Sequence, residues 1–203
     1  MVTFWTLLAA YLLGALPFGY IVTWLVKRTD IRRYGSGNIG ATNVMRLLGP
    51  AGGLLVLFLD ALKGAVAVLL ARAAGGGREL LLAAALLAMI GHSYPVFLKF
   101  RGGKGAATGI GVLIPLTGWV TAAVLGVAAA VIAATRYVSL GSIAGALSLP
   151  LFLYLFGFEP VDLYFGGAAA LLVLLRHREN IRRLLQGKEP KLGQRVKAEE
   201  KKD

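Results

Sequence analysis

Long apolar runs constrain this chain more than any other feature. Residues 2–26 hold no charged side chain, and a helix needs only about 20 apolar residues to cross a bilayer. The run is too long for the apolar core of a signal peptide, so we expect it to remain as a membrane span. Apolar residues make up 57% of the chain, against roughly 45–50% in ordinary globular domains. The sequence therefore predicts an all-α, polytopic membrane protein.

Five runs predict single membrane helices, at about 4–26, 53–71, 79–97, 140–156 and 161–175. A further apolar segment, 106–135, fits either one long span or a helical hairpin. Pro115 and Gly118 near its middle favour a break. The hairpin also brings the basic loops and the basic tail to one face, as the positive-inside rule prefers. We therefore expect about seven transmembrane helices, with the N-terminus outside, the C-terminus inside and short glycine-rich loops in the cytoplasm.

Composition excludes several classes of partner and site. Lys and Arg number 22 against 10 Asp and Glu, a net charge of +12, but no nucleic-acid-binding signature is present and no such partner is expected. The absence of cysteine excludes disulfides, thiol nucleophiles and thiolate metal ligands. The two histidines, His92 and His177, belong to no cluster with metal-ligand spacing. We expect no metal and no other cofactor.

The most distinctive polar stretch is residues 35–46, Gly-Ser-Gly-Asn-Ile-Gly-Ala-Thr-Asn-Val-Met-Arg, here called the serine–glycine motif. Its glycines allow backbone N–H groups to converge, and its neutral donors and its arginine suit a phosphate. The binding candidates are Ser36, Gly37, Asn38, Gly40, Thr42, Asn43 and Arg46. The alternative is a plain Gly/Asn turn between two membrane helices, and the motif alone leaves both interpretations open.

A second polar stretch, residues 99–105, is called the Gly-Gly-Lys loop. It lacks both the first glycine of a nucleotide-binding P-loop and the Ser or Thr that follows the lysine, which disfavours nucleotide binding. Bare backbone at Gly102 and Gly103 beside the Lys104 ammonium still suits a small anion. A basic turn that only sets membrane topology is an equal alternative. We expect positive φ at Gly103, as at Gly37 and Gly40.

The third polar stretch, residues 176–189, is called the arginine motif. At helical spacing His177 and Asn180 share a face, and Arg176 lies on a nearby one. Juxtamembrane arginines of this kind also bind anionic lipid headgroups or set topology. The charged residues 191–203 that follow are expected to form a disordered cytoplasmic tail.

Two charged residues lie inside the apolar run 53–71. Asp60 and Lys63 are three residues apart, so they share a helix face and can pair, which lowers the cost of burying either. We regard them, with His92, as structural residues or as further members of a site.

Together these stretches resemble the bacterial membrane acyl-phosphate:glycerol-3-phosphate acyltransferases. The resemblance is carried by residues 35–46, by 91–97 with 100–105, by 176–181 and by 59–64. It implies one integral-membrane acyltransferase domain over residues 1–190. That domain would transfer a fatty acyl group from acyl phosphate to the 1-hydroxyl of glycerol 3-phosphate, giving lysophosphatidic acid and inorganic phosphate. Acyl-CoA would not be the donor, and the His-x4-Asp pattern of acyl-CoA-dependent glycerolipid acyltransferases is absent.

The resemblance also assigns roles. Lys104, His177 and Asn180 would be catalytic, and Arg176 would bind substrate together with Gly102, Gly103 and the serine–glycine motif. For His177 we favour positioning of glycerol 3-phosphate over proton abstraction, because neighbouring arginines disfavour a charged imidazole. The partners implied are acyl phosphate, glycerol 3-phosphate and the bilayer, with functional coupling to enzymes that form acyl phosphate and to a second acyltransferase. The implied location is the bacterial cytoplasmic (inner) membrane, multi-pass, with the active site facing the cytoplasm.

A transporter of phosphate, phosphate esters or lipid headgroups is the alternative from another class. Broken helices, glycine loops and buried charges such as Asp60 and Lys63 occur in transporters too. The polar loops, however, gather on one expected face, whereas alternating access requires a site near the middle of the membrane.

Overall fold

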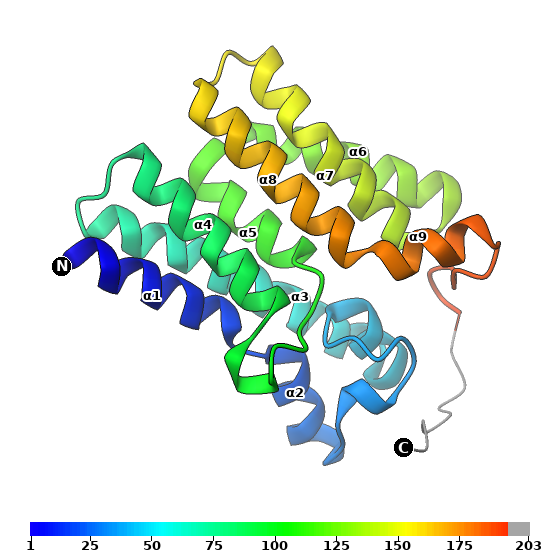
Figure 1. Cartoon of the computed structure of the whole chain (residues 1–203). Coiled ribbons are helices and arrows are strands. Elements are labelled where there is room, and N and C mark those ends of the chain that lie inside the picture. The colour runs from blue at the N-terminus through cyan, green and yellow to red at the C-terminus, as the bar shows by residue number, and fades with distance from the viewer. Residues whose placement is uncertain (195–203) are drawn as a thin grey trace.

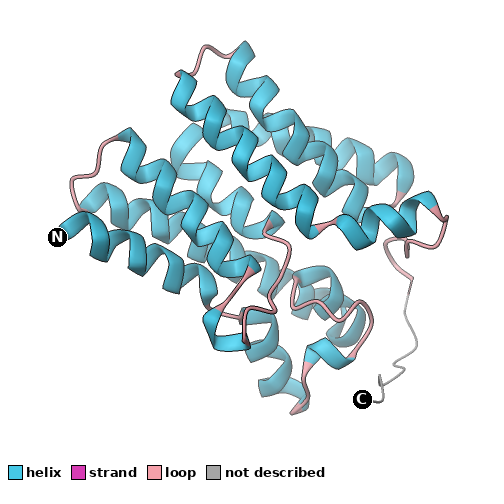
Figure 2. Ribbon diagram, viewed as in Figure 1, coloured by secondary structure: helices cyan, strands magenta, loops and turns pink. Residues whose placement is uncertain are grey.

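The computed structural model describes residues 1–194, and helices and loops are its only elements over that range (Figures 1 and 2). In chain order the helices are α1 (Val2–Ala15), α2 (Phe18–Lys27), α3 (Ala41–Ala73), α4 (Arg78–Ser93), α5 (Ala106–Thr117), α6 (Trp119–Thr135), α7 (Val138–Leu155), α8 (Pro160–Arg176) and α9 (Arg178–Leu185). Two short 3-10 turns are η1 (Ile31–Arg33) and η2 (Val96–Leu98).

The helices form two groups. Helices α1, α3, α4 and α5 pack together, α6, α7 and α8 form the second group, and α4 contacts α8 between them (Figure 1). Small residues let backbones approach closely, since a Cβ on Gly14 would overlap the backbone of Ala88 and one on Gly91 would overlap that of Tyr11. Close contacts of this kind are typical of helices packed in a membrane, where no water drives them together.

Four helical regions are long and apolar enough to cross a membrane, namely Val2–Lys27, Ala41–Ala73, Arg78–Leu98 and Val138–Leu155. Helices α5 and α6 are apolar but shorter. Large apolar side chains such as Phe4, Phe58 and Tyr164 lie on the outside of the bundle, a surface suited to lipid rather than to water. The expected all-α membrane fold is confirmed, and the count of seven crossings stays a prediction.

Two expected elements begin or break elsewhere. The first span is divided into α1 and α2 at Pro17, which has no N–H with which to continue a helix. Helix α3 begins at Ala41 rather than near residue 53, and a kink at Gly49, with φ of 82°, interrupts it before Pro50. The second half of the serine–glycine motif therefore forms the first turns of a helix, although the sequence predicted a loop throughout.

The segment with two interpretations folds as α5 and α6, which turn back at Gly118 (φ 52°). At that turn Arg78, the first residue of α4, donates to the carbonyl of Leu116 over 3.0 Å. At the far end of α6, the N–H of Leu192 donates to the carbonyl of Arg136 over 2.7 Å. Helix α6 thus returns to the end of the bundle at which α5 began, as the hairpin interpretation predicted.

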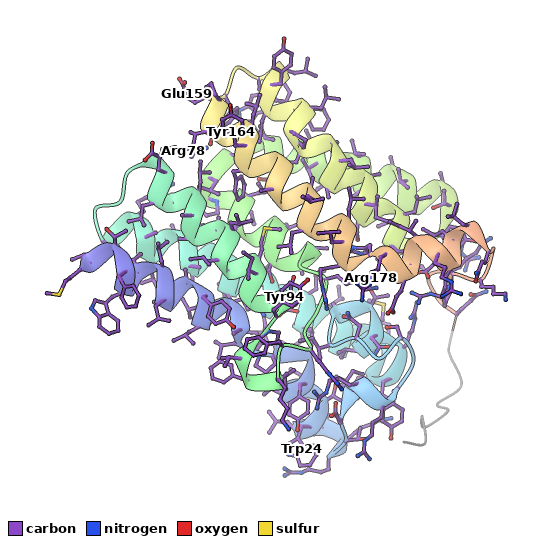
Figure 3. The ribbon with its side chains drawn as sticks, viewed as in Figure 1. Trp24, Arg78, Tyr94, Glu159, Tyr164 and Arg178 are labelled. Atoms are coloured by element: carbon purple, nitrogen blue, oxygen red, sulfur yellow. The ribbon has the colours of Figure 1, made fainter. Side chains whose placement is uncertain are left out.

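The two ends of the bundle differ in character. Arg78, Glu159 and Tyr164 lie at one end, while Trp24 and Arg178 lie toward the other (Figure 3). The three polar motifs all lie at the second end, beside α2, the start of α5 and α9 (Figure 1).

The expected tail is described only in part. Residues 191–194 are described, and the Arg136 guanidinium donates to the carbonyl of Leu192 over 3.0 Å. Residues 195–203 lie outside the described residues, so the disordered tail and the domain boundary at residue 190 stay predictions.

Candidate active site

The three polar motifs meet at one cavity of about 390 Å³. Its polar wall carries Ser36, Asn38, Gly40, Thr42, Asn43, Arg46, Asp60, His92, Lys104, His177, Asn180 and Glu189. Its apolar wall comes from α5, α6, α7 and α8, through residues that include Val112, Leu113, Val124, Ala128, Ile132, Leu149 and Phe165. Five expected site residues do not line it, namely Gly37, Lys63, Gly102, Gly103 and Arg176. The cavity therefore suits a molecule with a polar head and an apolar chain.

Asn43 shapes the serine–glycine motif from its centre. Its buried amide nitrogen lies 2.8 Å from the carbonyl of Asn38, 3.0 Å from that of Tyr34 and 3.3 Å from that of Ile31. Its amide oxygen accepts the N–H of Ser36 over 3.1 Å. Both ends of the amide are therefore used by the loop itself, so Asn43, expected to bind substrate, holds the binding loop in shape.

The glycines of the motifs are required for two different reasons. Gly37 has the expected positive φ, at 70°. The same expectation is wrong for Gly40, whose φ is −73°, and for Gly103, whose φ is not positive. Gly40 instead donates its N–H to the Asn38 side chain over 2.7 Å, and a Cβ on Gly103 would overlap the imidazole of His92. The nearby His92 ring, rather than a positive φ, therefore excludes a side chain at Gly103.

Arg176 holds the Gly-Gly-Lys loop. Its guanidinium donates to the carbonyl of Gly103 over 3.0 Å and to that of Gly102 over 3.1 Å. It also lies 4.8 Å from the centre of the Tyr94 ring, within cation–π range. Arg176, expected to bind substrate, therefore fixes the backbone that precedes Lys104.

Two cations remain for a ligand. Arg46 and Lys104 both line the cavity, and within residues 1–194 neither makes a hydrogen bond or an ion pair with another side chain or carbonyl. Burial lowers the pKa of Lys104 to about 8, with Arg183 and Arg46 adding to the shift and Glu189 opposing it. Lys104 is therefore mostly protonated at neutral pH, and the two cations can bind anionic groups.

His177 has a defined tautomer. Its Nδ1 lies 2.8 Å from the carbonyl of Val173, and because a carbonyl only accepts, Nδ1 carries the proton and Nε2 is left as an acceptor. Burial and then the Lys104 ammonium lower the pKa of His177 to about 4. The ring is thus neutral at pH 7 and can accept a hydrogen bond from a hydroxyl, but it is a weak base.

Glu189 is a site residue that the sequence did not identify. Its carboxylate accepts from Asn180 over 2.6 Å, from Ser139 over 2.8 Å and from Arg183 over 2.7 Å. Burial raises its pKa, but these hydrogen bonds outweigh burial and the pKa lies below its usual value. With its amide nitrogen held by Glu189, Asn180 keeps a buried amide oxygen that has no partner among the described residues. Glu189 stands at no helical spacing from these partners. The only sequence signal that could have identified it is that it is an acidic residue among basic ones.

Asp60 and Lys63 pair as the sequence predicted, with Nζ 2.8 Å from the carboxylate. His92 joins them, because its Nδ1 lies 3.0 Å from the same Nζ. All three are buried, and Asp60 and His92 also line the cavity. The three candidates therefore form one cluster behind the Gly-Gly-Lys loop.

Known proteins are similar to this chain over most of its length. The family model described as glycerol-3-phosphate acyltransferase matches residues 4–187. A glycerol-3-phosphate acyltransferase of Thermus thermophilus is 46% identical over 197 residues, covering 96% of this chain and 97% of the relative. One from Desulforudis audaxviator is 52% identical over 181 residues, covering 89% and 90%.

Solved structures match as well. The crystal structure of PlsY (YgiH), an integral membrane glycerol 3-phosphate acyltransferase, in its glycerol 3-phosphate form has a TM-score of 0.91 at 41% identity, covering 95% of this chain and 96% of that one. Its lysophosphatidic acid form has a TM-score of 0.88 at 40% identity. The matches run through all three polar motifs and extend over nearly the whole chain, and the chain therefore belongs to the glycerol-3-phosphate acyltransferase family.

Proposed function

We propose that this chain transfers a fatty acyl group from acyl phosphate to the 1-hydroxyl of glycerol 3-phosphate. The hydroxyl oxygen forms an ester bond to the acyl carbon, the bond between that carbon and the phosphate oxygen breaks, and lysophosphatidic acid and inorganic phosphate leave. Family membership supports the acceptor and the acyl transfer. The acyl phosphate donor is supported by the shape and charge of the cavity.

The observation that carries the proposal is the division of the cavity. Lys104 and Arg46 lie on its polar wall, and apolar residues of α5 to α8 form the rest. Acyl phosphate has a compact anionic head and a long apolar chain, so it matches both walls at once. Glycerol 3-phosphate brings a second phosphate, and two cations are present to hold two anionic heads near each other.

The chemistry then needs orientation more than a strong base. The Nε2 acceptor of His177 can hold the attacking hydroxyl in line with the acyl carbon. With a pKa of about 4, His177 is a weaker base than a phosphate dianion, whose conjugate acid has a pKa of about 6. We therefore assign the proton to a phosphate of the reactants and a positioning role to His177. We infer direct transfer, because the chain contains no cysteine, no serine hydroxyl is hydrogen-bonded to a histidine among residues 1–194, and an acyl phosphate already carries a good leaving group.

The test is product formation by purified protein in detergent micelles. With acyl phosphate and glycerol 3-phosphate we expect lysophosphatidic acid and inorganic phosphate in equal amounts, and with acyl-CoA no product. If product formed only with acyl-CoA, the assignment of acyl phosphate as the donor would be wrong, but acyl transfer to glycerol 3-phosphate would stand. No product from either donor, together with phosphate uptake by proteoliposomes, would favour the transporter.

We also propose that the site faces the cytoplasm of the bacterial inner membrane, where glycerol 3-phosphate and the coupled acyl-phosphate-forming and second acyltransferase enzymes would meet it. Because the chain has no cysteine, single cysteines report topology directly. Exposed Arg33 in η1, Arg101 in the Gly-Gly-Lys loop and Gln186 after α9 belong to segments at the end of the bundle that holds the motifs. Exposed Glu159 lies at the other end (Figure 3). In intact spheroplasts an impermeant maleimide should label only Glu159→Cys. If it labelled the other three variants and not Glu159→Cys, the protein would have the opposite orientation in the membrane.

A further inference from the structure

A buried lysine outside the cavity makes two hydrogen bonds and one ion pair. The Nζ of Lys63 lies 2.7 Å from the carbonyl of Leu16, 2.8 Å from the carboxylate of Asp60 and 3.0 Å from Nδ1 of His92. The two hydrogen-bond partners, Leu16 and His92, lie at the α1–α2 break and on α4, and the ion-pair partner, Asp60, lies on α3. Because an ammonium only donates, the contact makes Nδ1 of His92 an acceptor and puts the proton of a neutral imidazole on Nε2.

His92 in turn supports the Gly-Gly-Lys loop. Its carbonyl accepts the N–H of Gly103 over 2.9 Å, and its ring lies where a Cβ of Gly103 would be, with Nε2 the nearest atom. Gly102 packs equally closely against the His92 carbonyl. From the other side, Arg176 donates to the carbonyls of both glycines. The loop is therefore held between the imidazole of His92 and the guanidinium of Arg176.

Lys104 follows Gly103 directly, and within the described residues its ammonium has no hydrogen-bonded partner of its own. Its position in the cavity thus depends on the backbone that precedes it. A tilt of the His92 ring would move Gly103 and, with it, the Lys104 ammonium.

We propose that Lys63 is a positioning residue for substrate phosphate: through His92 and Gly103 it fixes where the Lys104 ammonium stands in the cavity. This rests on the proposed function, because it names what holds one cation of that site. Displacement by about 1 Å of a group that binds a reactant can cost on the order of 100-fold. The loss should appear mainly as a raised KM for the phosphate substrate that Lys104 binds, with a smaller effect on kcat.

The experiment compares Lys63→Met with a matched variant at the other end of the bundle. Arg78 also pairs with a buried aspartate, Asp162, at 2.6 Å and also donates to a main-chain carbonyl, that of Leu116. Arg78→Met therefore removes a similar set of contacts far from the cavity. We expect both variants to lower the melting temperature in detergent, and only Lys63→Met to raise KM, by about 10- to 100-fold, for the same substrate whose KM rises in Lys104→Arg.

A second pair of variants covers the case in which Lys63→Met does not fold, since it leaves the carboxylate of Asp60 buried and unpaired. His92→Leu removes the acceptor and the polar ring while Asp60 and Lys63 remain paired, and it should raise the same KM. His92→Gln keeps an acceptor for Lys63 and should restore most of that loss.

The outcomes separate the inference from the function. If the wild type makes no lysophosphatidic acid, the proposed function fails. If the wild type is active but Arg78→Met raises KM as much as Lys63→Met at an equal loss of melting temperature, Lys63 is only structural. An unchanged KM in folded Lys63→Met or in His92→Leu would overturn the inference equally.

Discussion

The pH dependence of substrate affinity offers a direct test of Lys104. Burial lowers the pKa of its ammonium to about 8, so the free enzyme carries this charge below pH 8 and loses it above. A bound phosphate stabilises the ammonium, and the loss should therefore appear in kcat/KM, which reports the free enzyme, rather than in kcat at saturation. Replacing Lys104 by arginine, whose pKa exceeds 12, should remove the dependence.

The magnitude follows from the titration. With a pKa of about 8, the protonated fraction falls from roughly nine-tenths at pH 7 to one-tenth at pH 9, so kcat/KM should fall about tenfold. A tenfold change corresponds to about 1.4 kcal/mol, which a charged hydrogen bond to phosphate, worth about 1.5–3 kcal/mol, can supply.

The assay is phosphate release in micelles between pH 6 and 10, for the wild type and Lys104→Arg side by side. Because the substrates ionise identically in both reactions, only the difference between the two profiles reports on Lys104. An alkaline fall in kcat/KM of equal size in both enzymes would refute the reasoning, as would a flat wild-type profile up to pH 9.

Four further changes test the remaining contacts. Arg46→Ala should lower kcat/KM by roughly 10- to 150-fold, and lysine there should restore part of it, because lysine lacks the bidentate fork. Gly103→Ala should impair activity strongly because its Cβ meets the imidazole of His92, whereas Gly167→Ala, whose Cβ meets nothing, should not. His177→Gln should keep most of its turnover at saturating glycerol 3-phosphate if the ring positions the hydroxyl, and a collapse of kcat with unchanged KM would make it the base. Glu189→Ala should lower the melting temperature and kcat together, because three charged or buried donors lose their acceptor.

Much of the fold could be predicted from the sequence because it depends on local pattern. Apolar runs longer than a bilayer is thick must become helices in lipid, since no other open backbone satisfies its own N–H and C=O groups there. The positive-inside rule and a glycine near the middle of 106–135 predicted the α5–α6 hairpin. Asp60 and Lys63 pair as expected because a spacing of three residues places two side chains on one helix face. The three motifs were found because short stretches rich in glycines, neutral donors and cations interrupt the apolar runs.

The division of labour among those residues was decided only by the tertiary structure. Asn43 and Arg176 were expected to bind phosphate, and in the structure both hydrogen-bond to the backbone that presents Ser36 and Lys104. Glu189 accepts a hydrogen bond from Asn180, although it lies beyond the end of α9 and at no helical spacing from Asn180. A donor or acceptor can be used by the protein or left for a ligand, and which occurs depends on groups brought close from distant parts of the chain. The residue types predicted a phosphate site; the packing of α4 and α8 against its loops decided which side chains are left to bind.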